Sequence, residues 1–161
     1  MGEPGKVRSH LGKLRRLVRT PADAWLLARM VGWSLVLPVA KFLFPVRRLA
    51  GFMRLEPRAG GRDRAFEQSV VSLSAWVFKS RPRSSRDNCL ERGLVTFRYL
   101  ARAGAQPDLV VGVAKGAEGV HGHVWVLVDG RPVHDAVESL RRFEPLLTFK
   151  SDGTVIRTAS A

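Results

Sequence analysis

The spacing of hydrophobic residues changes once along this 161-residue chain, from helical in its first two thirds to strand-like after them. Apolar side chains recur at helical spacing in residues 64–79 and again from Cys89 to about Arg102. Residues 109–114 predict a buried strand, and residues 120–128 predict a second strand with strict alternation. Helices followed by hairpin-linked strands predict an α+β fold with a small antiparallel sheet.

A long apolar stretch precedes these elements. Residues 20–23 (Thr-Pro-Ala-Asp) have the pattern of a helix start, but Pro38 and two cations interrupt the apolar residues that follow. Because proline breaks or kinks a helix, we predict two helices, one ending near Leu37 and one from Pro38 to Phe52. They would pack in the core or face a partner. Peripheral membrane contact through residues 22–52 is the alternative, since basic flanks suit an interfacial helix.

Proline and glycine mark the boundaries between segments. Residues 55–63 predict a linker. We therefore divide the chain into a basic, apolar helical N-terminal region over residues 1–58, a core over residues 64–150 and a tail over residues 151–161. Within the core, residues 140–150 predict a short helix or an irregular packing segment, and the tail is expected to be frayed.

Composition narrows the class of protein. Hydrophobic residues make up 45% of the chain and charged residues 25%, which is typical of a globular domain. One cysteine cannot form an intramolecular disulfide, and together with four histidines it lacks the paired spacing of a zinc site. We therefore expect no metal and no cofactor. The basic N-terminus has no apolar run followed by a small-residue cleavage site, so we expect a cytoplasmic protein, with membrane association as the alternative.

The net charge of +13 is concentrated near the N-terminus. Residues 1–58 carry twelve Lys and Arg against three acids, whereas residues 59–161 carry fifteen against eleven. This excess favours an acidic partner, an anionic membrane surface or nucleic acid, with a solvated basic face as the alternative. Nucleic acid is not expected, because the cations are not interleaved with aromatic residues or placed on a recognisable reading helix.

The only cysteine stands where a helix start would make it reactive. Asn88 predicts a helix cap, and Glu91 three residues later completes a capping box. Cys89 would then be the first helical residue, where free backbone N–H groups and the helix dipole stabilise a thiolate. Arg86 and Arg92 add positive charge nearby. Without a partner base, however, Cys89 would be a small buried residue at a helix start.

Two later segments supply a base and an acid. A thiol nucleophile requires an adjacent imidazole and usually a third group that orients it. His123 lies on the alternating strand, and Asp135 follows the hairpin signal Asp129-Gly130. A two-residue turn would put Asp135 on the opposite face from His123, so a triad predicts a three-residue loop or a bulge. A tight turn would favour His134 or no third member, and a structural His123 is the alternative.

Four segments together resemble the transglutaminase-like cysteine peptidases of lasso-peptide biosynthesis. They are Asn-Cys-Leu-Glu-Arg-Gly-Leu (88–94), Leu-Val-Val-Gly-Val (109–113), Gly-His-Val-Trp-Val (122–126) and Asp-Gly-Arg-Pro-Val-His-Asp (129–135). The resemblance covers about residues 64–150 and, more loosely, residues 20–55. It implies a transglutaminase- or papain-like core, in which the helix bearing the cysteine packs on a small antiparallel sheet, preceded by an N-terminal helical region. Gly122 and Val124 stand where this family often has alanine.

This resemblance also implies an activity and partners. Cys89 would be the nucleophile, His123 the base and Asp135 the orienting acid of a peptidase that removes the leader peptide from a lasso-peptide precursor through a thioacyl-enzyme. The partners would be the precursor leader peptide, a small leader-recognition protein and an asparagine-synthetase-like cyclase. The Cys89 backbone N–H is a natural oxyanion donor, and Asn88 and Trp125 are further candidates for the oxyanion site or cleft.

Two alternatives to the peptidase stay open. The first is a transglutaminase or other acyltransferase, which would use the same three residues with an amine in place of water. The second is a non-enzymatic basic adaptor for a membrane or a partner, in which the cysteine is inert.

Overall fold

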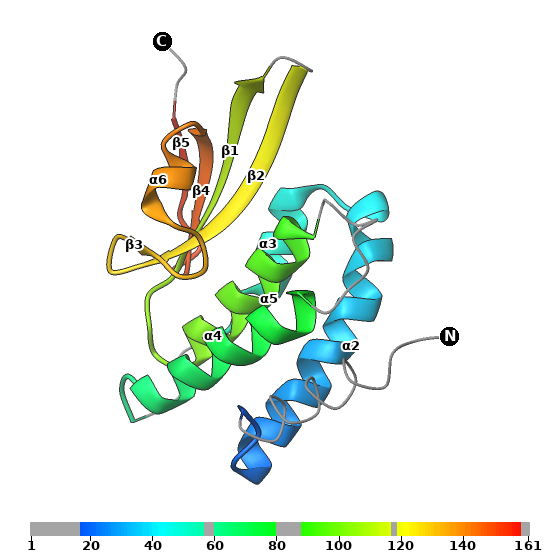
Figure 1. Ribbon diagram of the computed structural model, residues 1–161, viewed down its shortest axis with the longest axis vertical. Coiled ribbons are helices and arrows are strands. Elements are labelled where there is room, and N and C mark those ends of the chain that lie inside the picture. The colour runs from blue at the N-terminus through cyan, green and yellow to red at the C-terminus, as the bar shows by residue number, and fades with distance from the viewer. Residues whose placement is uncertain (1–16, 57–59, 80–87, 117–118, 159–161) are drawn as a thin grey trace, which may run out of the picture.

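The structure of the protein is a computed structural model, which describes residues 17–56, 60–79, 88–116 and 119–158 (Figure 1). Among these described residues, four helices come first, and a sheet with one short helix follows. The elements are α2 (Pro21–Leu43), α3 (Val46–Met53), α4 (Arg64–Lys79), α5 (Cys89–Arg102), β1 (Asp108–Gly116), β2 (Gly119–Val128), β3 (Arg131–Pro132), α6 (Val137–Leu140), β4 (Glu144–Lys150) and β5 (Val155–Arg157). This arrangement confirms the α+β class.

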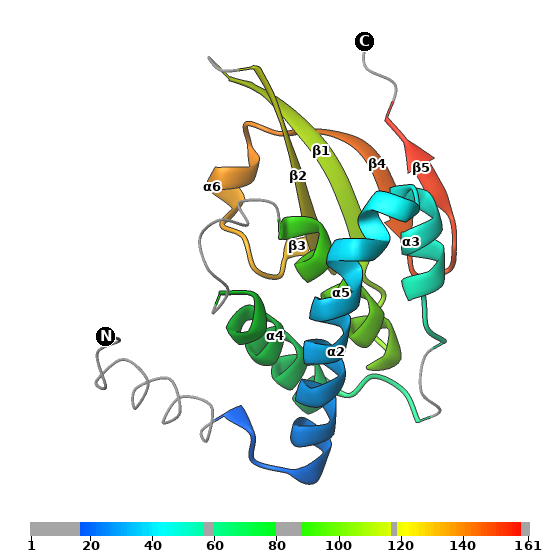
Figure 2. The same ribbon diagram turned by 90° about the vertical axis from the view of Figure 1, so that its right-hand side faces the viewer.

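The five strands form one antiparallel sheet in the order β3-β2-β1-β4-β5. Helix α5 lies between this sheet and the other helices: it contacts β1 and β2 on one side and α2, α3 and α4 on the other (Figure 2). The chain from β3 to β4 has to cross from one edge strand to the far side of β1. This crossing contains α6. Asp135, before α6, and Phe143, after it, both lie beside His123 of β2.

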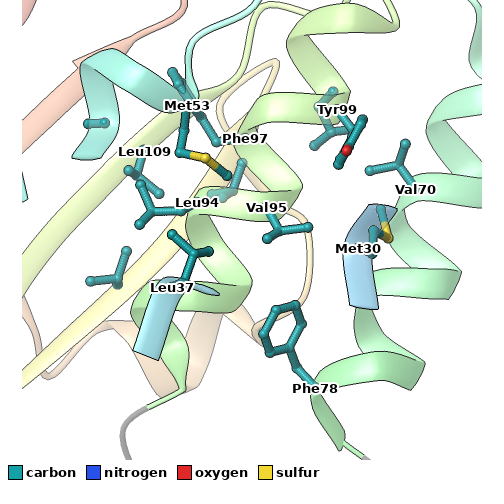
Figure 3. Packing of buried hydrophobic residues seen from close by; sticks show 14 of the residues in the cluster. Met30, Leu37, Met53, Val70, Phe78, Leu94, Val95, Phe97, Tyr99 and Leu109 are labelled. Atoms are coloured by element: carbon teal, nitrogen blue, oxygen red, sulfur yellow. The ribbon is translucent and has the colours of Figure 1, made fainter. Parts of the chain in front are cut away.

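Helix α5 is central, because most of its side chains are buried, including those of Glu91 and Thr96. Phe97, Tyr99 and Leu100 are each 1% exposed, and Leu94 and Val95 are completely buried. Figure 3 shows side chains from α2, α3, α4 and β1 converging on this helix. A helix that is buried along most of its length is held by the core, so the fold fixes the position of its first residue, the cysteine.

Glycines set the approach of α5 to its neighbours. A Cβ on Gly93 would lie 3.0 Å from Cγ1 of Val124, so the glycine lets α5 pack closely on β2. At the other end of the helix, Gly104 has a φ of 80°, and the Ala105 N–H donates to the Leu100 carbonyl at 3.2 Å. This is the left-handed cap typical of glycine after a helix.

The N-terminal apolar stretch differs from the prediction of two helices that meet at Pro38. The capping box of Thr20 and Asp23 begins α2, as the sequence indicates, but α2 continues through Pro38 to Leu43. A proline inside a helix costs about 3 kcal/mol. Here the buried residues around it, including Leu37 at 2% exposure, hold the helix in place. The break comes instead at Pro45, which caps α3 in an extended conformation.

The end of the chain is also more regular than expected. Glu144–Lys150 is strand β4 rather than a helix or an irregular segment, and it pairs with the length of β1. Val155–Arg157, inside the tail expected to be frayed, is strand β5 and pairs with β4. Local sequence gave neither prediction because these strands are stabilised by their pairing with β1, which is distant in sequence.

Candidate active site

Cys89 is the first residue of α5 and is half-buried. The predicted capping box is wrong, because the Asn88 side chain makes no cap hydrogen bond. Its Nδ2 donates to the Phe78 carbonyl at 2.9 Å, and Glu91, only 3% exposed, pairs with Lys41 Nζ at 3.0 Å. The start of α5 is therefore tied to the end of α4 and to α2. These ties fix the position of the thiol from two sides.

His123 lies on β2 where no strand covers the outer edge of the described sheet. β3 pairs only with Leu127 and Val128, so the rest of β2 is open on that side. The imidazole hydrogen-bonds with Asp135, and the influence of Asp135 and of Cys89 raises its pKa to about 9 against the effect of burial. The cysteine and the histidine, 34 residues apart in the sequence, are thus close enough to interact electrostatically.

Asp135 reaches His123 by a route that the sequence did not predict. The hairpin has a tight two-residue turn, in which Asp129 and Gly130 have φ of 52° and 73° and Val128 pairs with Arg131. The expected three-residue loop or bulge is therefore wrong. Pairing ends with the bond from the Val133 N–H to the Val126 carbonyl, and residues 133–135 then bend. Once the chain has left the ladder, strand alternation no longer sets where its side chains point.

The His123 Nε2 atom lies 3.2 Å from Oδ1 of Asp135. Burial opposes ionisation of this carboxyl, but the hydrogen bond with His123 and the charge of Arg92 outweigh it, and its pKa lies below the ordinary value. Asp135 is therefore a carboxylate at neutral pH. It holds one ring nitrogen of His123 and leaves Nδ1 for Cys89.

Arg92 is a member of the site that sequence reasoning placed differently. Its guanidinium lies 3.1 Å from Oδ1 and 3.2 Å from Oδ2 of Asp135. The sequence predicts that its charge, with that of Arg86, lies beside the thiol; in the structure the Arg92 charge lies beside the acid, and Arg86 is outside the described residues. The available signal was its spacing, since residue 92 lies one turn after residue 89 on the same helix face. Arg92 therefore connects the acid to the helix that bears the nucleophile.

His134 has no contact with the nucleophile. Its Nε2 lies 3.1 Å from the Ser74 hydroxyl and 3.2 Å from the Thr96 hydroxyl, between α4 and α5. Burial and the nearby charge of Arg92 lower its pKa to about 4. A tight turn was expected to favour His134 as third member, but Asp135 occupies that position beside His123.

Aromatic rings enclose the other side of His123. Trp125 stacks with it at a centroid distance of 6.0 Å, and Phe143 lies 5.0 Å from it. A Cβ on Gly112 would lie 2.7 Å from the Trp125 ring, so this glycine makes room for the indole. Trp125 is 5% exposed, and its ring packs against one side of the His123 imidazole. Asn88 is adjacent to the thiol, with its amide already bonded to Phe78.

The chemistry available at this site is nucleophilic. Cys89 lies near His123, and Asp135 holds His123 by a hydrogen bond, so the proton of a thiol can reside on an imidazole that a carboxylate stabilises. Within the described residues, no three His, Cys, Asp or Glu side chains are grouped so that they could hold a metal ion.

Comparisons with known proteins agree with this geometry. The family model described as Transglutaminase-like superfamily matches residues 33–148, well over half of the chain, and the match spans Cys89, His123 and Asp135. No curated protein and no solved structure matches significantly.

Proposed function

This chain belongs to the transglutaminase-like superfamily, whose members are generally cysteine proteases or transglutaminases, and from that premise we propose that it is a leader peptidase of lasso-peptide maturation. The observation that carries the enzymatic part is the contact of Cys89, at a helix start, with a His123 that Asp135 holds. The substrate part is supported by the resemblance of residues 88–94, 109–113, 122–126 and 129–135 to peptidases of that pathway.

In the proposed reaction, the raised pKa of His123 keeps the proton of the Cys89 thiol on the imidazole, and the thiolate attacks the carbonyl carbon at the leader–core junction. The tetrahedral intermediate expels the core amine, which takes the proton from the imidazolium, and the leader stays bound as a thioester. His123 then accepts a proton from water as the water oxygen attacks the thioester. The leader leaves as a carboxylic acid, and the thiolate and imidazolium are restored.

The surrounding residues stabilise the charges that form. The backbone N–H of Cys89 is one of the first in α5, has no partner within the helix, and is the oxyanion donor in this mechanism. Asp135 stabilises the imidazolium and fixes its orientation, and Arg92 keeps Asp135 ionised and in place. We assign Trp125 to the wall of the cleft.

The proposed partners follow from the substrate. A lasso precursor requires a small recognition protein that presents its leader and an asparagine-synthetase-like cyclase that closes the freed N-terminus. The cleavage test therefore combines this protein with a precursor and its recognition protein. Mass spectrometry is expected to detect separate leader and core peptides, with loss of both products in Cys89→Ala.

Acyl transfer to an amine is the second candidate, because the same superfamily contains transglutaminases. The acyl-enzyme is common to both reactions, and only the acceptor differs. Adding a primary amine in excess to the cleavage reaction distinguishes them. A free leader acid supports the peptidase, whereas an amide between leader and amine, or a mass gain on a glutamine, would show an acyltransferase. Full function of Cys89→Ala in any assay would indicate a non-enzymatic adaptor.

A further inference from the structure

Helix α2 has an exposed apolar face in addition to the residues that it buries. Between Ala24 and Leu43, every exposed position is apolar or glycine except Arg29. Phe42 is 83% exposed, Leu43 68% and Leu35 67%. Single exposed apolar residues are ordinary on a protein surface, but a continuous face of them along a long helix marks an interaction site.

The inner side of α2 belongs to the core. Leu26 and Met30 are completely buried, and Lys41 pairs with the buried Glu91 of α5 at 3.0 Å. By length and composition α2 is the one described helix that could cross a membrane. Crossing would expose this core and leave the Glu91 carboxylate without its partner. The outer face can therefore meet an apolar phase only while α2 lies along it.

Charge indicates which apolar phase fits. From Ala24 to Leu55 the chain contains five cations and no acidic residue. Arg47 and Arg48 are exposed on α3, directly after the apolar end of α2, beside Phe52 at 69% exposure. Apolar and aromatic side chains bordered by arginine match the boundary between acyl chains and anionic headgroups.

We propose that the outer face of α2 and α3 binds an anionic lipid surface, with α2 lying in the plane of the membrane. In Figure 2, α2 runs along the front of the helical layer and α3 extends from its end, so the two helices share one side of the molecule. The Lys41–Glu91 pair joins this face to α5 only two residues after Cys89. Binding would thus set the position of the nucleophile relative to the membrane.

Flotation of the full chain with lipid vesicles tests the apolar part. We expect binding to vesicles of phosphatidylcholine mixed with phosphatidylglycerol and little binding to phosphatidylcholine alone. The variant Leu35→Gln/Val39→Gln/Phe42→Gln should lose at least about tenfold in partitioning, because it removes side chains that insert between the acyl chains. The matched control is Val120→Gln/Val137→Gln/Ile156→Gln, which changes three exposed apolar residues elsewhere and should bind like the wild type.

A second pair of variants tests the charge without altering the apolar face. Arg47→Glu/Arg48→Glu should lose about fivefold per arginine, and high salt should remove the difference. Arg131→Glu/Arg157→Glu carries the same change of net charge on other exposed positions and should retain more binding. Circular dichroism establishes that each variant is folded. Phe42→Gln alone, at the most exposed position, serves if the triple variant is not.

Three results would overturn the proposal. Equal partitioning of the apolar variant and its control would show that this face does not contact lipid. A dimer in light scattering that the same variant dissociates, with no vesicle binding, would assign the face to a second copy of the chain or to another protein surface. Resistance of the bound protein to alkaline carbonate would show that α2 spans the membrane.

Discussion

His123 and His134 lie eleven residues apart and occupy opposite kinds of environment. His123 stands at an open sheet edge between a carboxylate and a thiol, and its pKa rises to about 9. His134 is enclosed between α4 and α5 with two hydroxyl groups, and its pKa falls to about 4. One is therefore protonated and the other neutral at pH 7. The difference follows from their surroundings, since Asp135 and Cys89 raise the pKa of His123, whereas burial and the charge of Arg92 lower the pKa of His134.

This comparison also shows how one acid defines the site. Asp135 is adjacent to His134 in sequence but bonds to His123, and Arg92 holds its carboxylate from α5. The bend at residues 133–135 turns the two neighbouring side chains to different sides, the histidine to the helices and the aspartate to β2. The contact with Asp135, and not adjacency in the sequence, therefore determines which histidine is the candidate base.

Replacing His123 is expected to have the largest effect, and replacing His134 provides the comparison. His123→Gln removes the group that accepts and returns the proton, so leader cleavage should fall about a thousandfold or more. His134→Gln keeps a polar side chain near Ser74 and Thr96 and should stay within about threefold of the wild type. Initial rates of product formation by mass spectrometry measure both. Equal losses in the two variants would contradict the assignment of the base.

Removing the acid is expected to have the next largest effect. Asp135→Asn preserves the size of the side chain but not its charge, so the imidazolium loses stabilisation and its preferred orientation. We expect a loss of about 10- to 100-fold in turnover and a His123 pKa that moves down from about 9. Titration of the ring protons by NMR provides the second readout. An unchanged rate and pKa would remove Asp135 from the triad.

Removing the contact between Arg92 and Asp135 should have a smaller effect on activity, and it should also change the pKa of His134. Arg92→Gln leaves Asp135 bonded to His123 but raises its pKa, so activity should be lost at a higher pH on acidification than in the wild type. We expect about a fivefold lower rate at pH 7, because one charge-assisted contact is lost. His134 should also titrate at a higher pH, since the charge of Arg92 contributes to its low pKa.

Two controls separate this effect from general damage. Arg92→Lys restores the charge but not the forked contact and should recover part of the rate. Arg157→Gln removes an exposed cation on β5 and should change nothing. A pH profile of Arg92→Gln that superimposes on the wild type would show that Arg92 only stabilises the fold.

The sequence predicts those parts of the molecule that depend on local periodicity. Arg64–Lys79 and Cys89–Arg102 follow from helical spacing, and β1 and β2 follow from apolar runs bounded by turn signals. These elements need no knowledge of distant contacts, which explains why a single sequence was sufficient for them. Cys89, His123 and Asp135 were candidates by their chemistry and by the resemblance to the lasso-peptide peptidases, and their catalytic roles are part of the proposed function.

The remaining features depend on residues that are distant in sequence. Asn88 could cap its own helix, but the Phe78 carbonyl takes its amide instead. Pro38 should break α2, but packing on α4 and α5 outweighs its cost. Asp135 meets His123 only because β3 stops after two residues, and pattern rules for hairpins assume that strands continue. In each case a local preference competes with a tertiary contact of similar or greater free energy, and the tertiary contact wins.

The smallest expected effect is on the free energy of unfolding at acidic pH, which tests the low pKa of His134. In the unfolded chain this histidine titrates near 6.5, whereas in the fold its pKa is about 4. Between these values the unfolded state binds more protons, so stability falls as the pH decreases through this window and does not change on this account above it. At about 1.4 kcal/mol per pKa unit, the loss is about 3 to 4 kcal/mol in total. His134→Gln, which cannot titrate, should flatten the decline in urea unfolding free energy between these two pH values. His121→Gln, which changes an exposed histidine of β2, provides the control. A decline of the same steepness in His134→Gln would mean that His134 is already protonated in the folded protein, and the contrast with His123 would disappear.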